Sequence, residues 1–295
     1  MIPFPDISPE IFSVELFGVN LALRWYAVSY LLGFICALKI MKFFVIKERL
    51  WASEKPPFST DQADSFLTYL ILGVIIGGRL GYVFFYNPAY YALNPFDIFR
   101  IWDGGMAFHG GFVGVIAAVI LFSRANKLPL WPTADLIAVS TPPGLLFGRV
   151  ANFINAELWG RPTEVYWGVI FPGELAQRCE GVIGPCARHP SQLYEAGLEG
   201  LLLLIILIYM ALKGGFKRPG SLTGVFALGY GTSRFFVEYF RVPDQQFFSE
   251  ANPFGFAYKF GDFGVTMGQS LSLPMILVGL FLCVRSVIWH KNINS

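Results

Sequence analysis

Long apolar stretches, separated by short polar connections, dominate this 295-residue chain. Because about 20 consecutive apolar residues cross a bilayer as a helix, we expect each long stretch to span a membrane. The predicted fold is an all-α integral membrane protein with a single polytopic domain over residues 1–295. Its seven predicted spans are Asn20–Phe44, Ser65–Tyr86, Met106–Phe122, Ala134–Phe153, Leu193–Leu212, Leu222–Phe240 and Ser270–Ile288.

Basic residues predict the orientation of these helices. Lysine and arginine concentrate in the first, third and fifth connections and in the C-terminal tail, which is typical of cytoplasmic segments. The residues before Arg24 include Asp6, Glu10 and Glu15 but no basic residue. We therefore expect the N-terminus outside and the C-terminus in the cytoplasm, with the long loop 155–192 forming a small external cap.

The composition supports a lipid environment. Hydrophobic residues make up 55% of the chain and charged residues only 14%, whereas a soluble domain carries about 25% charged residues. The formal net charge of +2 is too small for a nucleic-acid-binding surface. No CxxC, HExxH, Walker A or GxGxxG motif occurs in the sequence, so it supports neither a metal nor a nucleotide cofactor.

The cysteines leave one question open. Cys36 and Cys283 lie in apolar spans and are most simply small core residues. Cys179 and Cys186 share the loop 155–192. They could form a disulfide if that loop faces an oxidising compartment, and the sequence is equally compatible with two free thiols.

Polar residues within the spans gather at one depth. With a rise of about 1.5 Å per residue, each polar residue can be placed along its helix. The cytoplasmic halves are almost purely apolar, so this asymmetry predicts one polar cavity that opens toward the outer leaflet. The residues near the outer ends are Arg24, Tyr26, Arg79, His109, Arg149, Asn152, Tyr194, Glu195, Tyr230, Arg234, Glu238 and Gln269.

Arg149 and Arg234 are the candidate anion-binding pair. A charge inside a membrane is costly and usually functional, and a guanidinium offers a planar fork of donors that matches a phosphate. At this depth the available phosphate is a phospholipid headgroup. The alternative is internal pairing, for example of Arg234 with Glu238 at i,i+4 or of Arg149 with Glu157.

His109, in WDGGMAFHGG, is the candidate general base, because histidine titrates near neutral pH. A histidine at a helix start is more often structural, but the flanking glycines leave room for a ligand. Tyr26 either anchors its helix at the interface or lines the cavity. For His189, before a proline, we favour a local hydrogen-bonding role. The stripe Gly73, Gly77, Gly81 predicts close helix packing and also carries Arg79, a further substrate-binding candidate.

Six fragments, in order, resemble the motifs of the prolipoprotein diacylglyceryl transferase family. The resemblance extends from Tyr26 to Gln269, and Ala151 and Ala156 stand where close relatives can have glycine. The fragments are RWYAVSY, GGRLGYVFFYN, IWDGGMAFHGG, FGRVANFINAELWGR, RHPSQLYE and GYGTSRFFVEYFRVPD.

The resemblance implies a bacterial inner-membrane enzyme without a metal or nucleotide cofactor, with its active site toward the periplasmic leaflet. Such an enzyme moves the diacylglyceryl group of phosphatidylglycerol to the lipobox cysteine of a signal-peptide-bearing preprolipoprotein, forming a thioether and releasing glycerol 1-phosphate. By motif position, the implied catalytic residues are His109, Arg234 and Tyr230. The implied substrate-binding residues, with Arg79 and Glu238 added from their depth, are Arg149, Asn152, Tyr26, Glu157, Gly160, Arg79 and Glu238.

A chemical hypothesis follows from these positions. His109 takes the thiol proton, directly or through water, and the two arginines neutralise the departing phosphate. The rival class is a lipid transporter or channel, which would share the arginines and the cavity but should show inverted repeats or paired broken helices. A purely structural scaffold would leave the clustered charges unexplained.

Overall fold

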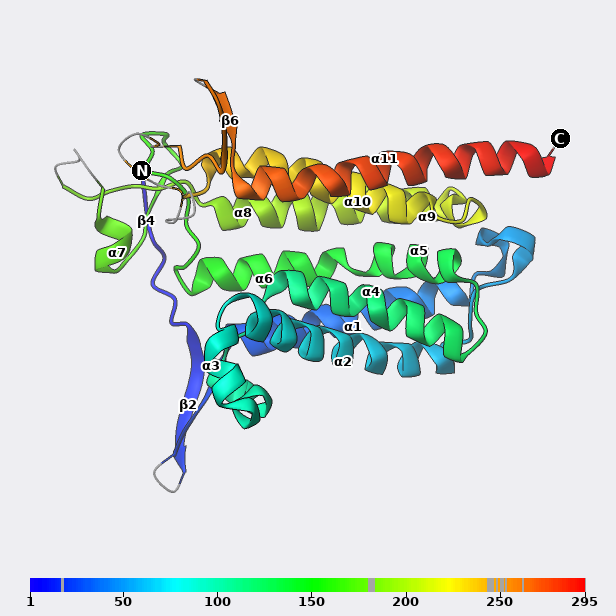
Figure 1. The fold of residues 1–295 in the computed structure, drawn as a ribbon, viewed down its shortest axis with the longest axis horizontal. Helices are drawn as coiled ribbons and strands as arrows, with labels where there is room; N and C mark the ends of the chain where they lie inside the picture. The colour runs from blue at the N-terminus through cyan, green and yellow to red at the C-terminus, as the bar shows by residue number, and fades with distance from the viewer. Residues whose placement is uncertain are drawn as a thin grey trace.

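The computed structural model describes residues 1–16, 19–179, 184–242, 247, 249, 252, 254–261 and 263–294, which are mostly helical (Figure 1). The longer helices are α1 (Trp25–Val45), α2 (Thr60–Phe85), α4 (Phe108–Ala125), α5 (Leu130–Ser140), α6 (Pro142–Ile154), α9 (Leu203–Leu212), α10 (Ser221–Val237) and α11 (Met267–Asn294). The short α-helices are α3 (Pro88–Leu93), α7 (Glu174–Gln177) and α8 (Ser191–Glu195). The π-helix η5 (Ala196–Leu202) joins α8 to α9, and the 3-10 helices are η1 (Glu48–Leu50), η2 (Ala52–Glu54), η3 (Pro95–Phe99), η4 (Ile101–Asp103), η6 (Gly215–Lys217) and η7 (Glu238–Phe240).

Short strands, which the sequence did not predict, form two-stranded sheets in the described segments outside the helices. β1 (Ile2–Pro3) pairs in parallel with β4 (Val169–Ile170). The hairpins, β2 (Glu10–Leu16) with β3 (Val19–Arg24) and β5 (Tyr258–Phe260) with β6 (Phe263–Val265), are antiparallel. Since β3 occupies the start of the first predicted span, α1 begins at Trp25 and not at Asn20.

Within the described residues, five helical segments are long and apolar enough to cross a membrane, namely α1, α2, α4, the segment Ser191–Leu212 and the first part of α11. The fourth predicted span, Ala134–Phe153, is divided into α5 and α6 at Thr141. Pro142 and Pro143 begin α6, and prolines lack the N–H that would continue the helix. The sixth predicted span is covered by α10 and η7.

The helices form two groups that run side by side in Figure 1. One group contains α8, η5, α9, α10 and α11, and the other contains α1, α2, α4, α5 and α6. Contacts of α6 with η5 and of α5 with α10 join the two groups. The carboxyl end of α6, the start of α8, the end of α10 and the starts of α4 and α11 therefore lie at the same end of the bundle.

The glycine stripe packs α2 against α4, as the sequence predicted. A Cβ at Gly73 would lie 2.5 Å from the Gly114 carbonyl oxygen, and one at Gly81 would lie 2.7 Å from Gly110 Cα. No larger residue fits between the two backbones without a shift. The close contact fixes the first turn of α4, which carries His109.

The main hydrophobic core lies at the end of the bundle opposite to the first turn of α4. Trp51 stacks on Phe216 with ring centroids 4.0 Å apart, and Phe66 stacks on Phe122 at 4.7 Å. This end also holds a buried carboxylate that the sequence did not reveal. Asp135 accepts hydrogen bonds from the backbone N–H groups of Gly220 and Thr223, and so caps the start of α10.

The segment after α6 builds a second, smaller core outside the helices. Phe171 and Val169 are buried there against Phe4 and Trp159. Cys179 and Cys186, left open by the sequence, form a disulfide in this segment. The N-terminal residues therefore pack on the loop 155–192 and add a strand to it.

Candidate active site

Three arginines from different parts of the chain converge on one glutamate. Arg149 lies on α6, Arg234 lies on α10, and Arg241 directly follows η7. Arg149 Nε is 2.8 Å from Glu195 Oε2, and the Nη1 atoms of Arg234 and Arg241 are 3.1 Å and 2.8 Å from Glu195 Oε1. Glu195, at the end of α8, is fully buried. The two arginines singled out in the sequence therefore do meet, but through a carboxylate that was not assigned a role.

Glu238 forms a second bridge between two of these arginines. Its Oε2 lies 2.9 Å from Arg234 Nη2 and 3.6 Å from Arg241 Nε. The Thr266 hydroxyl donates to its Oε1 at 3.2 Å. The predicted alternative of an i,i+4 pair between Arg234 and Glu238 is thus confirmed.

A third glutamate, Glu199, is buried nearby with much weaker contacts. It lies in η5, where the wider turn of a π-helix is frequently found at functional sites. The Arg149 Nη2 atom is 3.8 Å from Glu199 Oε2, and neither oxygen accepts a hydrogen bond from a described residue. Gly200 allows this close contact with α6, since a Cβ there would lie 2.7 Å from Leu146 Cα.

These side chains form what we call the Arg–Glu cluster: Arg149, Arg234, Arg241, Glu195, Glu199 and Glu238. Three positive and three negative formal charges balance without a ligand. Burying ion pairs costs desolvation energy, so such a cluster adds little net stability to the fold. Charged residues inside a membrane protein usually serve its function, so the cluster marks a candidate functional site. Each guanidinium has five N–H donors, and the glutamates contact only Nε and Nη2 of Arg149. Donors for a phosphate are therefore still present.

His109 is connected to the cluster through aromatic rings. It lies exposed in the first turn of α4, beside Phe108, with the two ring centroids 5.7 Å apart. Phe108 stacks on Tyr230 at 6.4 Å. Tyr230 is buried on α10, and its hydroxyl interacts with Arg149. The candidate base is thus exposed at the same end of the bundle as the arginines.

Tyr26, Asn152 and Glu157 form a separate polar group. The Asn152 amide donates to Glu157 Oε1 at 2.6 Å and to the Tyr26 hydroxyl, and Tyr26 in turn donates to Glu157. Asn152 follows Arg149 by three residues on α6, so the group and the cluster share one helix face. Glu157 lies in the loop after α6, where burial raises the pKa of its carboxyl group.

The backbone around Glu157 is tightly constrained. Ala156 and Leu158 adopt left-handed conformations, with φ of 51° and 56°. The Gln192 amide donates to the Glu157 carbonyl at 2.6 Å, and the Ser191 hydroxyl donates to the Leu158 carbonyl at 3.0 Å. The start of α8 therefore holds the loop that positions Glu157.

Gly160 has a clear steric reason to be glycine. A Cβ there would clash with the Phe240 carbonyl oxygen and would lie 2.7 Å from the His189 carbonyl oxygen. Its own N–H donates to His189 at 2.8 Å. Gly160 thus lets the loop pass between the ends of α10 and α8, and nothing in this geometry requires it to contact a substrate.

Arg79 lies outside the Arg–Glu cluster. Its Nε donates to the Ile98 carbonyl at 2.8 Å, Nη1 to Gly104 at 2.5 Å, and Nη2 to Asp97 at 2.6 Å. All three nitrogens therefore hold the backbone of residues 97–105. The segment leads into α4, so Arg79 supports the position of His109, and a contact between Arg79 and a substrate stays a prediction.

His189 makes the local contacts that we expected from the sequence. Its Nδ1 is 3.0 Å from the Tyr194 hydroxyl, which also accepts from Trp167 Nε1 at 2.7 Å. Burial lowers the pKa of the imidazole. His189 therefore braces the junction between the loop 155–192 and α8.

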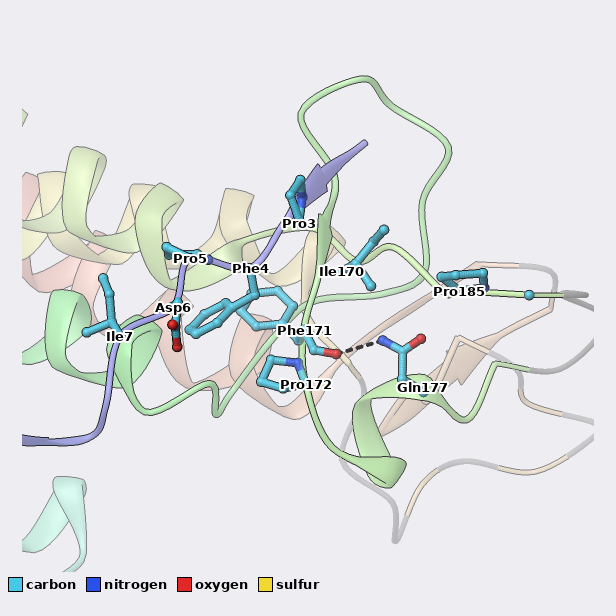
Figure 2. A pocket seen from close by; sticks show the side chains of 11 residues that line it. Pro3, Phe4, Pro5, Asp6, Ile7, Ile170, Phe171, Pro172, Gln177 and Pro185 are labelled. Atoms are coloured by element: carbon cyan, nitrogen blue, oxygen red, sulfur yellow. Dashed lines mark hydrogen bonds between the residues drawn. The ribbon is translucent and has the colours of Figure 1, made fainter.

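Two of the cavities among the described residues lie at the end of the bundle that carries the Arg–Glu cluster. The larger, about 800 Å³, lies between the N-terminal residues and the loop 155–192, and Figure 2 shows Phe4 and Phe171 in its wall. None of the predicted site residues lines it. The smaller, about 230 Å³, touches the cluster through Glu238. A cavity against Arg149 and His109 stays a prediction.

Sequence reasoning gave no role to Arg241, Glu195 or Glu199. One signal was available, because Glu195 and Glu199 are four residues apart in an otherwise apolar stretch and so share a helix face. Arg241 follows the sixth predicted span directly. The partners of Glu195 and Glu199 are 39 or more residues away in the chain, beyond any local pattern.

Apolar helices around a buried Arg–Glu cluster define a multi-pass membrane protein. The sequence profile of the family described as prolipoprotein diacylglyceryl transferase matches residues 13–285. The chain therefore belongs to this family.

Relatives from several bacteria cover nearly the whole chain. A protein of Cereibacter sphaeroides is 56% identical over 97% of this chain and 98% of its own. One from Roseobacter denitrificans is 55% identical over 97% of both chains, and one from Rhizobium leguminosarum is 44% identical over 97% and 94%. All three carry the name phosphatidylglycerol–prolipoprotein diacylglyceryl transferase.

Proposed function

We propose that this chain transfers the diacylglyceryl group of phosphatidylglycerol to the thiol of a lipobox cysteine in a preprolipoprotein. The names of its relatives support this transferase reaction and not the transporter alternative. The observation that carries the proposal is the convergence of Arg149, Arg234 and Arg241 on Glu195. Guanidinium groups recognise phosphate with paired, charge-assisted hydrogen bonds, and the donor lipid carries its phosphate at the bond that breaks.

The site would face the periplasmic leaflet of the bacterial inner membrane. The basic connections support a cytoplasmic C-terminus, and the cluster lies at the end of the bundle opposite to it (Figure 1). On this topology α5 with α6, and α10 with η7, complete seven spans, and residues 155–192 form a periplasmic cap. The Cys179–Cys186 disulfide in that loop fits an oxidising compartment.

The proposed reaction begins at the thiol. A cysteine thiol has a pKa of about 8.5, so a base must take its proton before attack at neutral pH. His109 accepts that proton, and the sulfur attacks the glycerol carbon that carries the phosphate. The C–S bond forms as the C–O bond breaks, and glycerol 1-phosphate leaves with both electrons of that bond. The proton on His109 can then pass to the leaving phosphate.

The arginines would stabilise the leaving group. Charge grows on the phosphate oxygens as the ester bond breaks, and fixed donors in a water-poor site are most effective there. Glu195 and Glu238 orient the guanidiniums, since each contacts two or more of them. Tyr230 would act between His109 and Arg149, given its stacking on Phe108. Tyr26, Asn152 and Glu157 would hold a polar part of the substrate next to the cluster, on the same face of α6.

A two-product assay tests this proposal. The purified protein is mixed with phosphatidylglycerol and a lipobox peptide, and glycerol phosphate release is measured. Release is expected only with the cysteine peptide and not with the matched serine peptide. A transporter would release no glycerol phosphate with either peptide, and that result would refute the transferase.

A further inference from the structure

A small cavity lies beside Glu238. Residues from four segments line it: the loop after α6, η7 at the end of α10, residues 254–256, and the start of α11. Its volume of about 230 Å³ is below the ~300–1,000 Å³ typical of sites for drug-sized molecules. The cavity therefore suits a small polar group and not an acyl chain.

The polar lining has hydrogen-bonding capacity that the protein itself does not use. Arg161 Nε is buried and has no hydrogen-bond partner among the described residues. Only Nη2 of its guanidinium donates in the described part of the chain, to the Phe254 carbonyl at 3.2 Å. Leaving a buried donor unpaired costs about 1–3 kcal/mol, so an acceptor from outside the protein would be stabilising.

The remaining walls combine acceptors with aromatic side chains. Glu238 and Gln269 are 6% and 2% exposed, and both line the cavity. Gln269 Oε1 accepts the Thr266 N–H at 3.1 Å, which fixes the orientation of the amide. Tyr239 and Phe256 complete the wall. Hydroxyl groups could both donate to Glu238 and accept from Arg161 in such a space.

Glu238 places the cavity next to the predicted phosphate site. Glu238 lines the cavity while its Oε2 lies 2.9 Å from Arg234 Nη2. A group bonded directly to a phosphate at Arg234 would therefore lie beside Glu238 and within reach of the cavity. In phosphatidylglycerol that group is glycerol, which carries two free hydroxyls.

We propose that this cavity binds the free glycerol of the phosphatidylglycerol headgroup, with Arg161, Glu238 and Gln269 selecting for its two hydroxyls. The inference rests on the proposed transferase function and adds the basis of its headgroup choice. A site built to hydrogen-bond hydroxyls rejects an analogue that lacks them, because its own buried groups are then left unpaired. Without a hydroxyl in the cavity, the buried Arg161 Nε would be left without a hydrogen-bond partner among the described residues.

Donor competition tests the inference. The full-length protein is assayed in detergent with phosphatidylglycerol and with phosphatidylethanol, whose headgroup has no free hydroxyl. We expect the wild type to prefer phosphatidylglycerol by at least about 100-fold in kcat/KM. Arg161→Met should reduce that preference about 10-fold or more, mainly by raising the KM for phosphatidylglycerol. Arg178→Met, on an exposed arginine of the loop, is the matched control and should keep the preference.

A second variant guards against loss of folding. Gln269→Glu keeps the oxygen that accepts the Thr266 N–H but replaces the amide donor, and it should also lower the preference. Equal use of both lipids by the wild type, or an unchanged preference in both variants, would overturn the cavity assignment and leave the transferase intact. No transfer from phosphatidylglycerol at all would overturn both.

Discussion

Glu195 and Glu199 lie one turn apart in the same helical segment, yet only Glu195 is held by hydrogen bonds from the arginines. Glu195 contacts Arg149, Arg234 and Arg241 at 2.8–3.1 Å, whereas Glu199 is 3.8 Å from Arg149. Both carboxylates are fully buried. These distances show that Glu195 holds the guanidinium groups in place, whereas Glu199 adds a negative charge without a close contact.

We predict that Glu195→Gln and Glu199→Gln differ sharply in stability. Removing the Glu195 charge leaves three guanidiniums without their shared partner, which should cost about 3–5 kcal/mol. Glu199→Gln should cost less than about 1 kcal/mol, because Glu199 accepts no hydrogen bond from a described residue. Thermal unfolding of the two purified variants in detergent measures the difference. Equal destabilisation of the two variants would show that the contacts of Glu195 with the arginines do not determine the stability of the cluster.

Arg149→Lys should reduce activity without loss of charge. A lysine can hold Glu195 or the phosphate but cannot present a planar fork to both. We expect kcat/KM to fall by about 10²–10³-fold, the usual cost of one lost donor to a developing anion. Arg124→Lys, at the exposed far end of α4, is the matched control and should be nearly silent. Wild-type kinetics for Arg149→Lys would rule out the fork.

Gly160→Ala should destabilise the loop after α6. The added methyl would meet the carbonyl oxygens of Phe240 and His189, and neither backbone has space to move freely. We expect a loss of more than about 1 kcal/mol, with reduced transfer. Gly144→Ala, which meets no atom within 4 Å, is the control. If both variants unfold at the wild-type temperature, the proposed close passage of the loop is absent.

Gly160 also shows which contacts a local sequence pattern cannot predict. Hydrophobic periodicity located the spans, and charge depth brought Arg149 and Arg234 to one end of the bundle. The sequence predicted a substrate contact for Gly160, which stays a prediction, but not its close contact with Phe240, which is 80 positions later in the chain and outside any local window. The convergence on Glu195 was invisible for the same reason.

Two further features were beyond the sequence for different reasons. The division of the fourth span depends on Pro142 and Pro143, whose effect on an apolar run is to end a helix or merely to kink it. The hairpin β2–β3 has apolar residues that also suit the start of a helix, so the first span was placed too early. The buried charge of Asp135 is explained by its hydrogen bond from the start of α10, a contact between distant residues that the sequence did not predict.

Folding stability should depend on His189 at mildly acidic pH. Burial lowers its folded pKa below the ordinary value of about 6.5. As pH falls through that ordinary value, the unfolded chain takes up a proton that the folded protein resists, so this contribution to stability is lost. The loss is complete once the pH is below the folded pKa.

His189→Gln removes this titration but retains a side-chain hydrogen-bonding group near Tyr194. The wild type should therefore lose more unfolding temperature than the variant between pH 7.5 and pH 5. The comparison uses apparent midpoints in one detergent, so contributions from other groups cancel. A wild-type loss equal to or smaller than that of the variant would contradict the assigned burial of His189.

The most direct test of the account is the intact mass of a lipobox peptide after incubation with the purified protein and phosphatidylglycerol labelled in its headgroup glycerol. We predict a mass increase on the cysteine equal to one diacylglyceryl group, with the label released as glycerol phosphate in equal amount. An unmodified peptide, or a peptide that retains the headgroup label, would contradict transfer at the Arg–Glu cluster.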